Sequence, residues 1–413
     1  MRVTFCAYDF VSKVGGPNAW LLRLLPTLQE MGVDVSVLFL SQDPLCSPTA
    51  AALCEKGVQT VVVKHFPTTE QKVRWILEQV KINPPDVFVP NLVVPAYYAG
   101  GWVRQAGIPT VGVLHSDDAF HRGLQEVFLF GDEFFRLSGL VCVSDYLQQE
   151  VLQQNPLDVD ICKLPCGAPV PSEQAALPVN ALRLAYVGRL EEEQKRISDV
   201  TKALCRVVKE VPGVEATLFG EGSARSAVEE ILEAHGQGLP ISLAGKVPSE
   251  QIQQLLLQQH VVILLSDYEG LPIALMEAMA CGLVPICKSI SSGIPELIDD
   301  GVSGLLVQDR GDEFVAEVRR LKDEPGLWQK LSIAARDKIV RDYSHTACAE
   351  GWFAFLEGLA CRTDKYAKIH IPDKLVLPPV HPSLAREDIR APSRYSVLVN
   401  KAAGLVKRLL GLR

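Results

Sequence analysis

The 413-residue sequence contains no CxxC pair, although it has eleven cysteines. The cysteines are scattered along the chain, and the closest pair is Cys162 and Cys166. An odd number of dispersed cysteines does not suit a disulfide framework, and paired cysteines are the usual start of a structural zinc site. We therefore expect neither, and this cysteine usage favours a reduced, cytoplasmic setting.

Long apolar runs and an excess of basic charge are also missing. No uninterrupted apolar stretch approaches the ~20 residues that span a bilayer, and the first residues, "MRVTFCAYDF", lack the apolar core of a signal peptide. The net charge is −8, which argues against nucleic acid as a partner because phosphate binding needs a basic surface. We expect a cytoplasmic protein, either soluble or peripheral at the inner membrane face.

Short β-branched runs alternate with longer helical patterns along most of the chain. Runs such as "DVSVLFL" and "VVILLS" are apolar on both faces, which is typical of parallel strands covered by helices on each side. A stretch rich in proline and small residues, "APVPSEQAALPVN", interrupts the alternation near residues 168–180. The pattern predicts an α/β protein with two Rossmann-like, doubly wound domains that face each other across a cleft. The predicted boundaries are 1–170, 171–360 and an extension, 361–413.

The first predicted strand is followed by a glycine pair rather than by GxGxxG. The absence of GxGxxG removes the main support for a nicotinamide or flavin cofactor, and we expect no cofactor. Gly15 and Gly16 precede a helix, so their backbone can approach a phosphate or a sugar near the positive helix N-terminus.

Several loops of the second half carry residues suited to a nucleotide. In "YVGRLEEEQKRISD", Arg189 and Lys195 flank an acidic loop before a helix, where two cations can hold a diphosphate. The alternative is a solvated charge cluster with the neighbouring glutamates. Gly220 again permits close backbone approach, and Val247 follows a third strand, where a flat base can lie.

The stretch "SDYEGLPIALMEAMACG" places two glutamates eight residues apart in an apolar context. Glu269 falls at the carboxyl end of a predicted strand, and Glu277 falls within the following helix. Along a helix, eight residues correspond to a rise of about 12 Å, so the two carboxylates cannot share a proton but can hold two ends of an extended ligand. Carboxylates accept hydrogen bonds from vicinal hydroxyls, which favours a sugar-containing ligand.

Together these segments resemble the retaining glycosyltransferases of family 4 (glycosyl transferases group 1), which have the GT-B fold. The resemblance rests on "EGLPIALME" as the E-x7-E motif, "GRLEEEQK" as the diphosphate loop, the first-half glycine pair, "FGEG" and "PELIDDGVSGLLV". It is dense over residues 185–310 and looser over 1–170. It implies a nucleotide-diphosphate sugar as donor, a hydroxyl-bearing acceptor bound on the side of the first domain, and no metal.

The resemblance also implies roles for individual residues. Glu269 contacts the transferred sugar, Glu277 the ribose, and Arg189 and Lys195 the departing diphosphate. His115, in "VLHSDD", matches a first-half histidine that lies near the reacting sugar. The implied donor-binding residues are Gly15, Gly16, Gly188, Gly220, Val247, Gly270, Leu271, Pro272 and Glu277. The implied reaction is a front-face transfer in which the leaving diphosphate accepts the proton of the acceptor.

The sequence departs from the family pattern at two points. The loop from Arg189 to Lys195 is one residue longer than the commonest spacing, so Arg196 is an alternative to Lys195. Cys166 stands where many members have asparagine, and its contact is left open. Asp158-Val159-Asp160 has the DxD form of metal-dependent transferases, but its loop position favours a solvated turn.

Two other functions remain open from the sequence. One is a nucleotide-sugar epimerase of the same architecture, and the other is a noncatalytic sugar-binding relative. The carboxyl terminus is a further open feature, because residues 389–413 contain six Lys or Arg and no Asp or Glu. Leu398, Leu405 and Leu409 fall on one face of a helix there, which predicts either contact with an anionic membrane or packing on the first domain.

Overall fold

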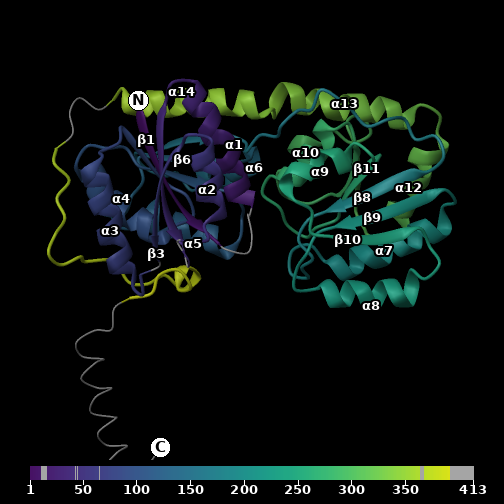
Figure 1. Cartoon of the computed structure of the whole chain (residues 1–413), viewed down its shortest axis with the longest axis horizontal. Helices are drawn as coiled ribbons and strands as arrows, with labels where there is room; N and C mark the ends of the chain where they lie inside the picture. Colours follow the sequence, from purple (N-terminus) through teal and green to yellow (C-terminus); the bar gives the residue numbers. More distant parts are fainter. Residues whose placement is uncertain (11–15, 42, 44, 65, 363–366, 391–413) are drawn as a thin grey trace, which may run out of the picture.

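The β-branched runs of the first half form parallel strands whose side chains are buried on both faces. In the computed structural model, which describes residues 1–10, 16–41, 43, 45–64, 66–362 and 367–390, these strands make up the first lobe (Figure 1). They are β1 (Arg2–Asp9), β2 (Asp34–Ser41), β3 (Gln59–Lys64), β4 (Val87–Pro90), β5 (Val111–Leu114), β6 (Gly139–Cys142) and β7 (Asp160–Lys163). The orders are β3-β2-β1-β4 and β5-β6-β7, and a parallel bridge between Phe88 and Thr110 connects the two groups.

Helices between these strands supply the layers on both sides of the sheet. They are α1 (Gly16–Glu30), α2 (Pro48–Glu55), α3 (Thr69–Ile82), α4 (Val94–Gln105), α5 (Ala119–Phe128), the short η1 (Glu133–Phe135) and α6 (Asp145–Leu152). The start of α2 shows how a buried carboxylate fixes such a helix. Asp9 accepts hydrogen bonds from the Thr49 and Ala50 amides at 2.9 and 3.0 Å, where the first N–H groups of a helix lack partners.

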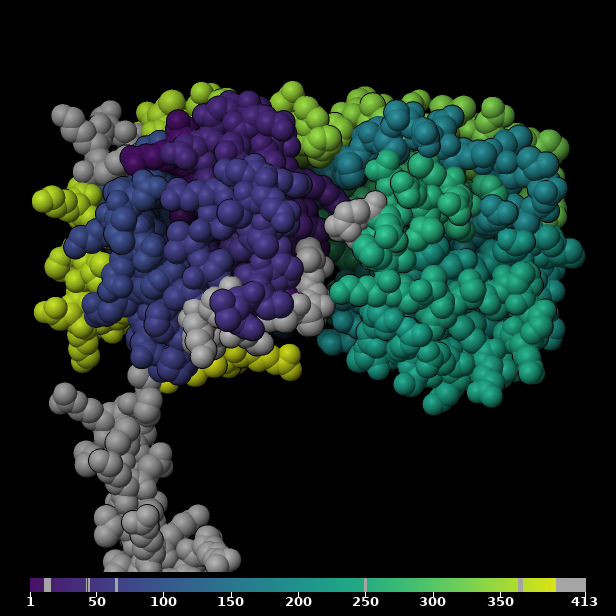
Figure 2. Space-filling model, viewed as in Figure 1, coloured from purple at the N-terminus to yellow at the C-terminus, as the bar shows by residue number. Residues whose placement is uncertain are grey.

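The second lobe contains one six-stranded parallel sheet of order β10-β9-β8-β11-β12-β13. Its strands are β8 (Leu182–Val187), β9 (Val214–Phe219), β10 (Ile241–Gly245), β11 (Val261–Leu264), β12 (Val284–Lys288) and β13 (Leu305–Val307). Its helices are α7 (Ile197–Glu210), α8 (Arg225–His235), α9 (Ser249–Leu256), α10 (Ile273–Ala280), α11 (Ile294–Leu297), α12 (Asp312–Asp323) and α13 (Leu327–Asp342). The predicted fold class, two Rossmann-like domains facing across a cleft, is confirmed; Figure 2 shows the two lobes meeting.

The last long helix, α14 (His345–Ala360), belongs to the first lobe by its packing. The Trp352 ring is fully buried, with its centroid 5.3 Å from Trp20 and 6.2 Å from Phe5. α14 falls within the range 171–360 expected for the second domain, yet its contacts are with the first lobe. The chain therefore crosses between the lobes near residue 168 and again near residue 344, where Ala168 N donates to Tyr343 O and His345 N donates to Ala168 O, each at 2.9 Å.

Residues 367–390 continue across the first lobe as an extended strap that includes η2 (Pro382–Leu384). Ala367 N donates to Ala106 O at 2.9 Å, and Thr69 N donates to Ile389 O at 2.6 Å. Near its end, the buried Asp388 carboxylate accepts from Tyr98 Oη at 2.9 Å and from Arg390 Nη2 at 2.6 Å. The predicted membrane-contacting helix beyond this point lies outside the described residues. Among the helices that are described, none has the length and apolarity needed to span a bilayer.

Candidate active site

Glu269 occupies the loop between β11 and α10, at the edge of the sheet that faces the first lobe. Its side chain is only 6% exposed, and its Oε1 lies 2.5 Å from Lys195 Nζ. The second oxygen, Oε2, accepts from Gln194 Nε2 at 3.2 Å. Burying a carboxylate is costly unless it is paired and hydrogen-bonded, and here both oxygens have partners. The structure thus holds one carboxylate in a fixed orientation beside a cation.

Gln194 links the loop from Arg189 to Lys195 to the loop that carries Glu269. Its role was not predicted from the sequence. Its side-chain amide donates to Tyr268 O at 3.0 Å, and its side-chain oxygen accepts from Arg189 Nη2 at 2.8 Å. Its backbone oxygen accepts from Asp267 N at 3.0 Å. The only sequence signal was its place beside Lys195 in the diphosphate loop. Gln194 therefore connects Arg189 to Glu269 and fixes the spacing between the loops.

Arg189 and Lys195, the expected diphosphate cations, have different environments. Arg189 is 56% exposed and also pairs with Glu191 at 2.8 Å, as the charge-cluster alternative predicts, whereas Lys195 is 11% exposed. Arg196 does not join these two cations. It directly precedes α7 with a backbone φ of 50°, and its guanidinium pairs with Asp199 at 2.8 Å. The structure thus brings Lys195, and not Arg196, to Glu269.

The amino end of α10 lies next to Glu269, and Glu277 lies one turn into the helix. Leu271 and Pro272 are buried before the first turn, where the free N–H groups of a helix favour an anion. Glu277 accepts a hydrogen bond from Arg23 Nη2 of α1, in the opposite lobe. The exposed fractions of the two side chains are 14% and 22%. Sequence reasoning did not identify Arg23, because 254 positions separate it from its partner.

Gly270 explains how closely the two lobes approach at this site. A Cβ atom at this position would lie 2.0 Å from the backbone oxygen of His115, so only glycine fits. The Glu269 loop is therefore seated directly on the loop after β5. Near the start of α1, a Cβ on Gly16 would lie 3.7 Å from Ile273 Cδ1 across the same cleft. Gly15 lies outside the described residues.

His115 is buried beneath this contact. Its Nε2 lies 2.8 Å from Asn91 Oδ1, so Nε2 carries the proton and Nδ1 is an acceptor. Nδ1 lies 3.8 Å from Cys166 Sγ, which identifies the contact of the residue that departs from the family pattern. Burial, followed by the nearby His121, lowers the pKa of His115 to about 3. Its imidazole is therefore neutral, with both nitrogens engaged.

The remaining expected donor-binding residues Gly188, Gly220 and Val247 lie in loops of the second lobe. A Cβ at Gly220, whose φ is 155°, would lie 1.9 Å from the backbone oxygen of Gly188. The close approach that Gly220 permits is therefore to Gly188 of the same chain. Val247 is half-buried two residues after β10, in the segment expected to face a base.

The two aspartates of the DxD sequence do not gather at the site. Asp160 begins β7 and pairs with Arg362, while Asp158 is an exposed turn residue with φ of 57°. Within the described part of the chain, no group of three or more His, Cys, Asp or Glu side chains could hold a metal ion. Asp118 begins α5, where its carboxylate accepts from His121 N at 3.0 Å and from His121 Nδ1 at 2.8 Å.

Comparison with known proteins identifies both lobes. Residues 14–170 match the model "Glycosyltransferase Family 4", and residues 172–338 match "Glycosyl transferases group 1". The amylovoran biosynthesis glycosyltransferase AmsK of Erwinia amylovora is 33% identical over 187 residues, which are 43% of this chain and 45% of that protein. Glycogen synthase of Mycobacterium tuberculosis is 29% identical over 180 residues, 42% of this chain and 43% of that protein. The chain thus spans less than half the length of these two relatives.

A solved structure extends the likeness to most of the chain. Anabaena HepE, crystallised in complex with UDP, has a TM-score of 0.70 and 17% identity, covering 87% of this chain and 100% of that protein. At this identity the likeness establishes the fold.

Proposed function

The chain belongs to the family 4, group 1 glycosyltransferases, and we propose that it transfers a sugar from a nucleotide-diphosphate sugar to a hydroxyl-bearing acceptor with retention of anomeric configuration. The observation that carries this proposal is the buried pair of Glu269 and Lys195 beside the amino end of α10. One fixed carboxylate, one buried cation and a helix N-terminus are thereby grouped at the face that meets the other lobe.

The proposed roles follow from charge and position. Lys195, Arg189 and the first N–H groups of α10 stabilise negative charge that develops on the departing diphosphate, which is a major source of rate enhancement in such transfers. Glu269 orients the sugar hydroxyls and opposes positive charge on the ring. The diphosphate oxygen accepts the proton of the acceptor hydroxyl on the same face as the new bond. His115 shapes the floor of the site as a neutral ring.

A bound UDP in a structural neighbour supports a nucleotide-diphosphate donor, although it does not choose the base. The cations Arg189 and Lys195 supply the positive charge that a divalent ion supplies in other transferases. We therefore propose a metal-independent reaction, which should continue at an unchanged rate in excess EDTA. A transfer rate that falls with EDTA and returns with Mg²⁺ or Mn²⁺ would contradict this part of the proposal.

The first experiment is a thermal-shift screen against uridine, guanosine and adenosine diphosphates and their glucose, galactose, mannose and N-acetylglucosamine derivatives. A sugar nucleotide that stabilises the protein is then incubated with hydroxyl acceptors, and NMR of the product gives the anomeric configuration. We expect an α-linked product from an α-linked donor. An inverted product contradicts retention, a new sugar nucleotide formed without acceptor indicates an epimerase, and binding without any turnover indicates a noncatalytic relative.

A further inference from the structure

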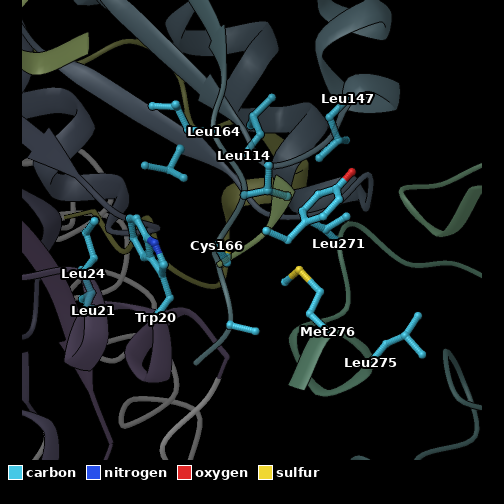
Figure 3. Packing of buried hydrophobic residues seen from close by; sticks show 14 of the residues in the cluster. Trp20, Leu21, Leu24, Leu114, Leu147, Leu164, Cys166, Leu271, Leu275 and Met276 are labelled. Carbon is cyan, nitrogen blue, oxygen red and sulfur yellow. The ribbon is translucent and has the colours of Figure 1, made fainter. Parts of the chain in front are cut away.

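Helices α1 and α10 contact each other across the cleft at two points. At the first, Gly16 lies against Ile273, and at the second, two turns further along α1, Arg23 donates to Glu277. Figure 1 shows these helices on facing sides of the two lobes, and Figure 3 shows buried apolar side chains of both, with Trp20 and Leu24 of α1 on one side and Met276 of α10 on the other. The polar pair thus links α1 of the first lobe to α10 of the second.

The pair leaves one hydrogen-bonding position open on each partner. Arg23 Nη1 is buried without a hydrogen-bond partner among the described residues. Arg23 engages Glu277 Oε1, and among the described residues no hydrogen bond reaches Glu277 Oε2. A carboxylate can accept several hydrogen bonds, so Glu277 can receive a ligand hydroxyl at Oε2 while Arg23 remains bound at Oε1.

Separating the lobes would leave each of these two charged side chains without its partner. Each side chain is at least three-quarters buried when they are together, and hydrogen bonds between charged groups are stronger than neutral ones. A second polar contact between the lobes, from Tyr146 N to Glu296 Oε1 at 3.0 Å, involves neither residue. Loss of the Arg23 pair therefore opens the cleft between α1 and α10, while the lobes stay joined at other contacts.

We propose that Arg23 is a positioning residue of the donor site that acts from the opposite lobe. It closes α1 onto α10 and orients Glu277, so that the free carboxylate oxygen receives a ribose hydroxyl only when the lobes are together. This inference rests on the proposed function and on the contact with the donor ribose that the family resemblance implies for Glu277. It makes ribose recognition depend on a residue that does not touch the nucleotide.

The ligand-binding test compares nucleoside diphosphates with forms that lack the 2′- and 3′-hydroxyls of the ribose. Wild-type protein, Arg23→Ala, Arg23→Lys and the matched control Arg341→Ala, an exposed arginine paired with Asp342, are titrated by calorimetry with uridine, guanosine and adenosine diphosphates and with their 2′,3′-dideoxy forms. For the nucleotide that wild type binds, Arg23→Ala should weaken the ribonucleotide by about tenfold and leave the dideoxy form within about twofold. Arg23→Lys should fall between. Equal losses for both forms, or no loss for either, would overturn the proposal.

A second measurement needs no ligand and separates this inference from the proposed function. Small-angle scattering of the free protein should give a larger radius of gyration for Arg23→Ala and Glu277→Gln than for wild type and Arg341→Ala. The charge exchange Arg23→Glu with Glu277→Arg should restore the wild-type radius but not ribonucleotide affinity, because residue 277 is then no longer a carboxylate. If no nucleotide binds wild type, the proposed function fails while scattering still tests the closure. An unchanged radius in Arg23→Ala would refute the closure itself.

Discussion

Lys195 Nζ lies 2.5 Å from Glu269 Oε1, and neither side chain is more than 11% exposed. Such a pair is poor evidence for stability in itself, because desolvation offsets much of the attraction. Its value is positional, since each charge fixes the other at the edge of the sheet. Replacing one partner affects both the chemistry and the burial of the other, and variants must be chosen with that coupling in mind.

Glu269→Gln should lower turnover by about a hundredfold or more while the protein remains folded. The amide keeps an oxygen for Lys195 but removes the negative charge that faces the reacting ring in the proposed reaction. The measurement is the transfer rate together with the melting temperature. Glu229→Gln, which alters an exposed ion pair on α8, is the matched control. Near-normal turnover in folded Glu269→Gln or Glu269→Ala protein would disprove the assignment.

Replacing Arg189 and Lys195 together by alanine should weaken binding of a nucleoside diphosphate by about a hundredfold, because two charge-assisted contacts are lost. Binding of the nucleoside alone should change less than about threefold. Calorimetry with both ligands gives the comparison, and Arg225→Ala on the exposed face of α8 serves as control. Equal losses for the two ligands would show that the cations have a structural role.

A pH effect on stability follows from His260, which lies far from the candidate site. Its Nδ1 accepts from Arg183 N at 2.9 Å, and burial, followed by Arg183, lowers its pKa to about 4. The unfolded chain, with an ordinary pKa near 6.5, binds the proton more readily. The stability that neutral His260 contributes is therefore fully present above about pH 6.5 and is lost as the pH falls toward 4.

His260→Asn should remove part of this pH dependence, since Asn keeps an acceptor for Arg183 N but does not titrate. Urea unfolding gives the free energy of unfolding at pH 7.5 and at pH 5. The decrease between these two pH values should be smaller in the variant than in wild type, by on the order of 1 kcal/mol. His115 contributes in the same direction and remains in both proteins. An identical loss in the two proteins would contradict the assignment to His260.

The strap also makes a measurable contribution to stability. Asp388→Asn removes the charge that faces Arg390 and keeps one acceptor for Tyr98, and we expect a loss of about 2 kcal/mol in the free energy of unfolding. Glu126→Gln, at the exposed pair with His381, should stay within about 0.5 kcal/mol. Urea titration compares them, and similar small losses would show that the strap is held by its apolar contacts alone.

The basic carboxyl terminus is expected to bring the protein to anionic lipid, where a lipid-linked acceptor could be presented. Flotation with vesicles of phosphatidylglycerol should recover the full-length protein, and a version ending at residue 390 should remain unbound. The cut is placed after Arg390 because this residue pairs with Asp388. Vesicles of phosphatidylcholine are the uncharged control. Equal flotation of both versions, or of neither, would refute the membrane contact.

Features of the fold that repeat along the sequence were predictable from it. Apolar runs predicted parallel strands such as β2 and β11, because a strand buried on both faces has few polar residues. The group 1 glycosyltransferase assignment followed in the same way, from motifs that fall where strands end. These features depend on local patterns of residues, which a single sequence displays.

Contacts between distant segments were not predictable from one sequence. The pairing of Arg23 with Glu277 depends on how the lobes meet, and neither neighbourhood differs from an ordinary helix. Trp352 on α14 likewise appeared to follow the second domain, although it packs against Phe5 and Trp20 of the first lobe. His115 was expected beside the sugar from the resemblance, whereas burial by Trp20 and Cys166 became visible only in three dimensions.

The adjacency of the two crossings at Ala168 and Ser344 gives the second lobe the character of an insert. Residues 169–343 leave the first lobe and return to it at neighbouring points that backbone hydrogen bonds hold together. We therefore expect that the segment can be exchanged for that of a relative as one unit, with both junctions preserved and α14 left in place. A graft made with one junction, near residue 170, would separate α14 from the Trp20 surface it covers and leave the amino-terminal core incomplete.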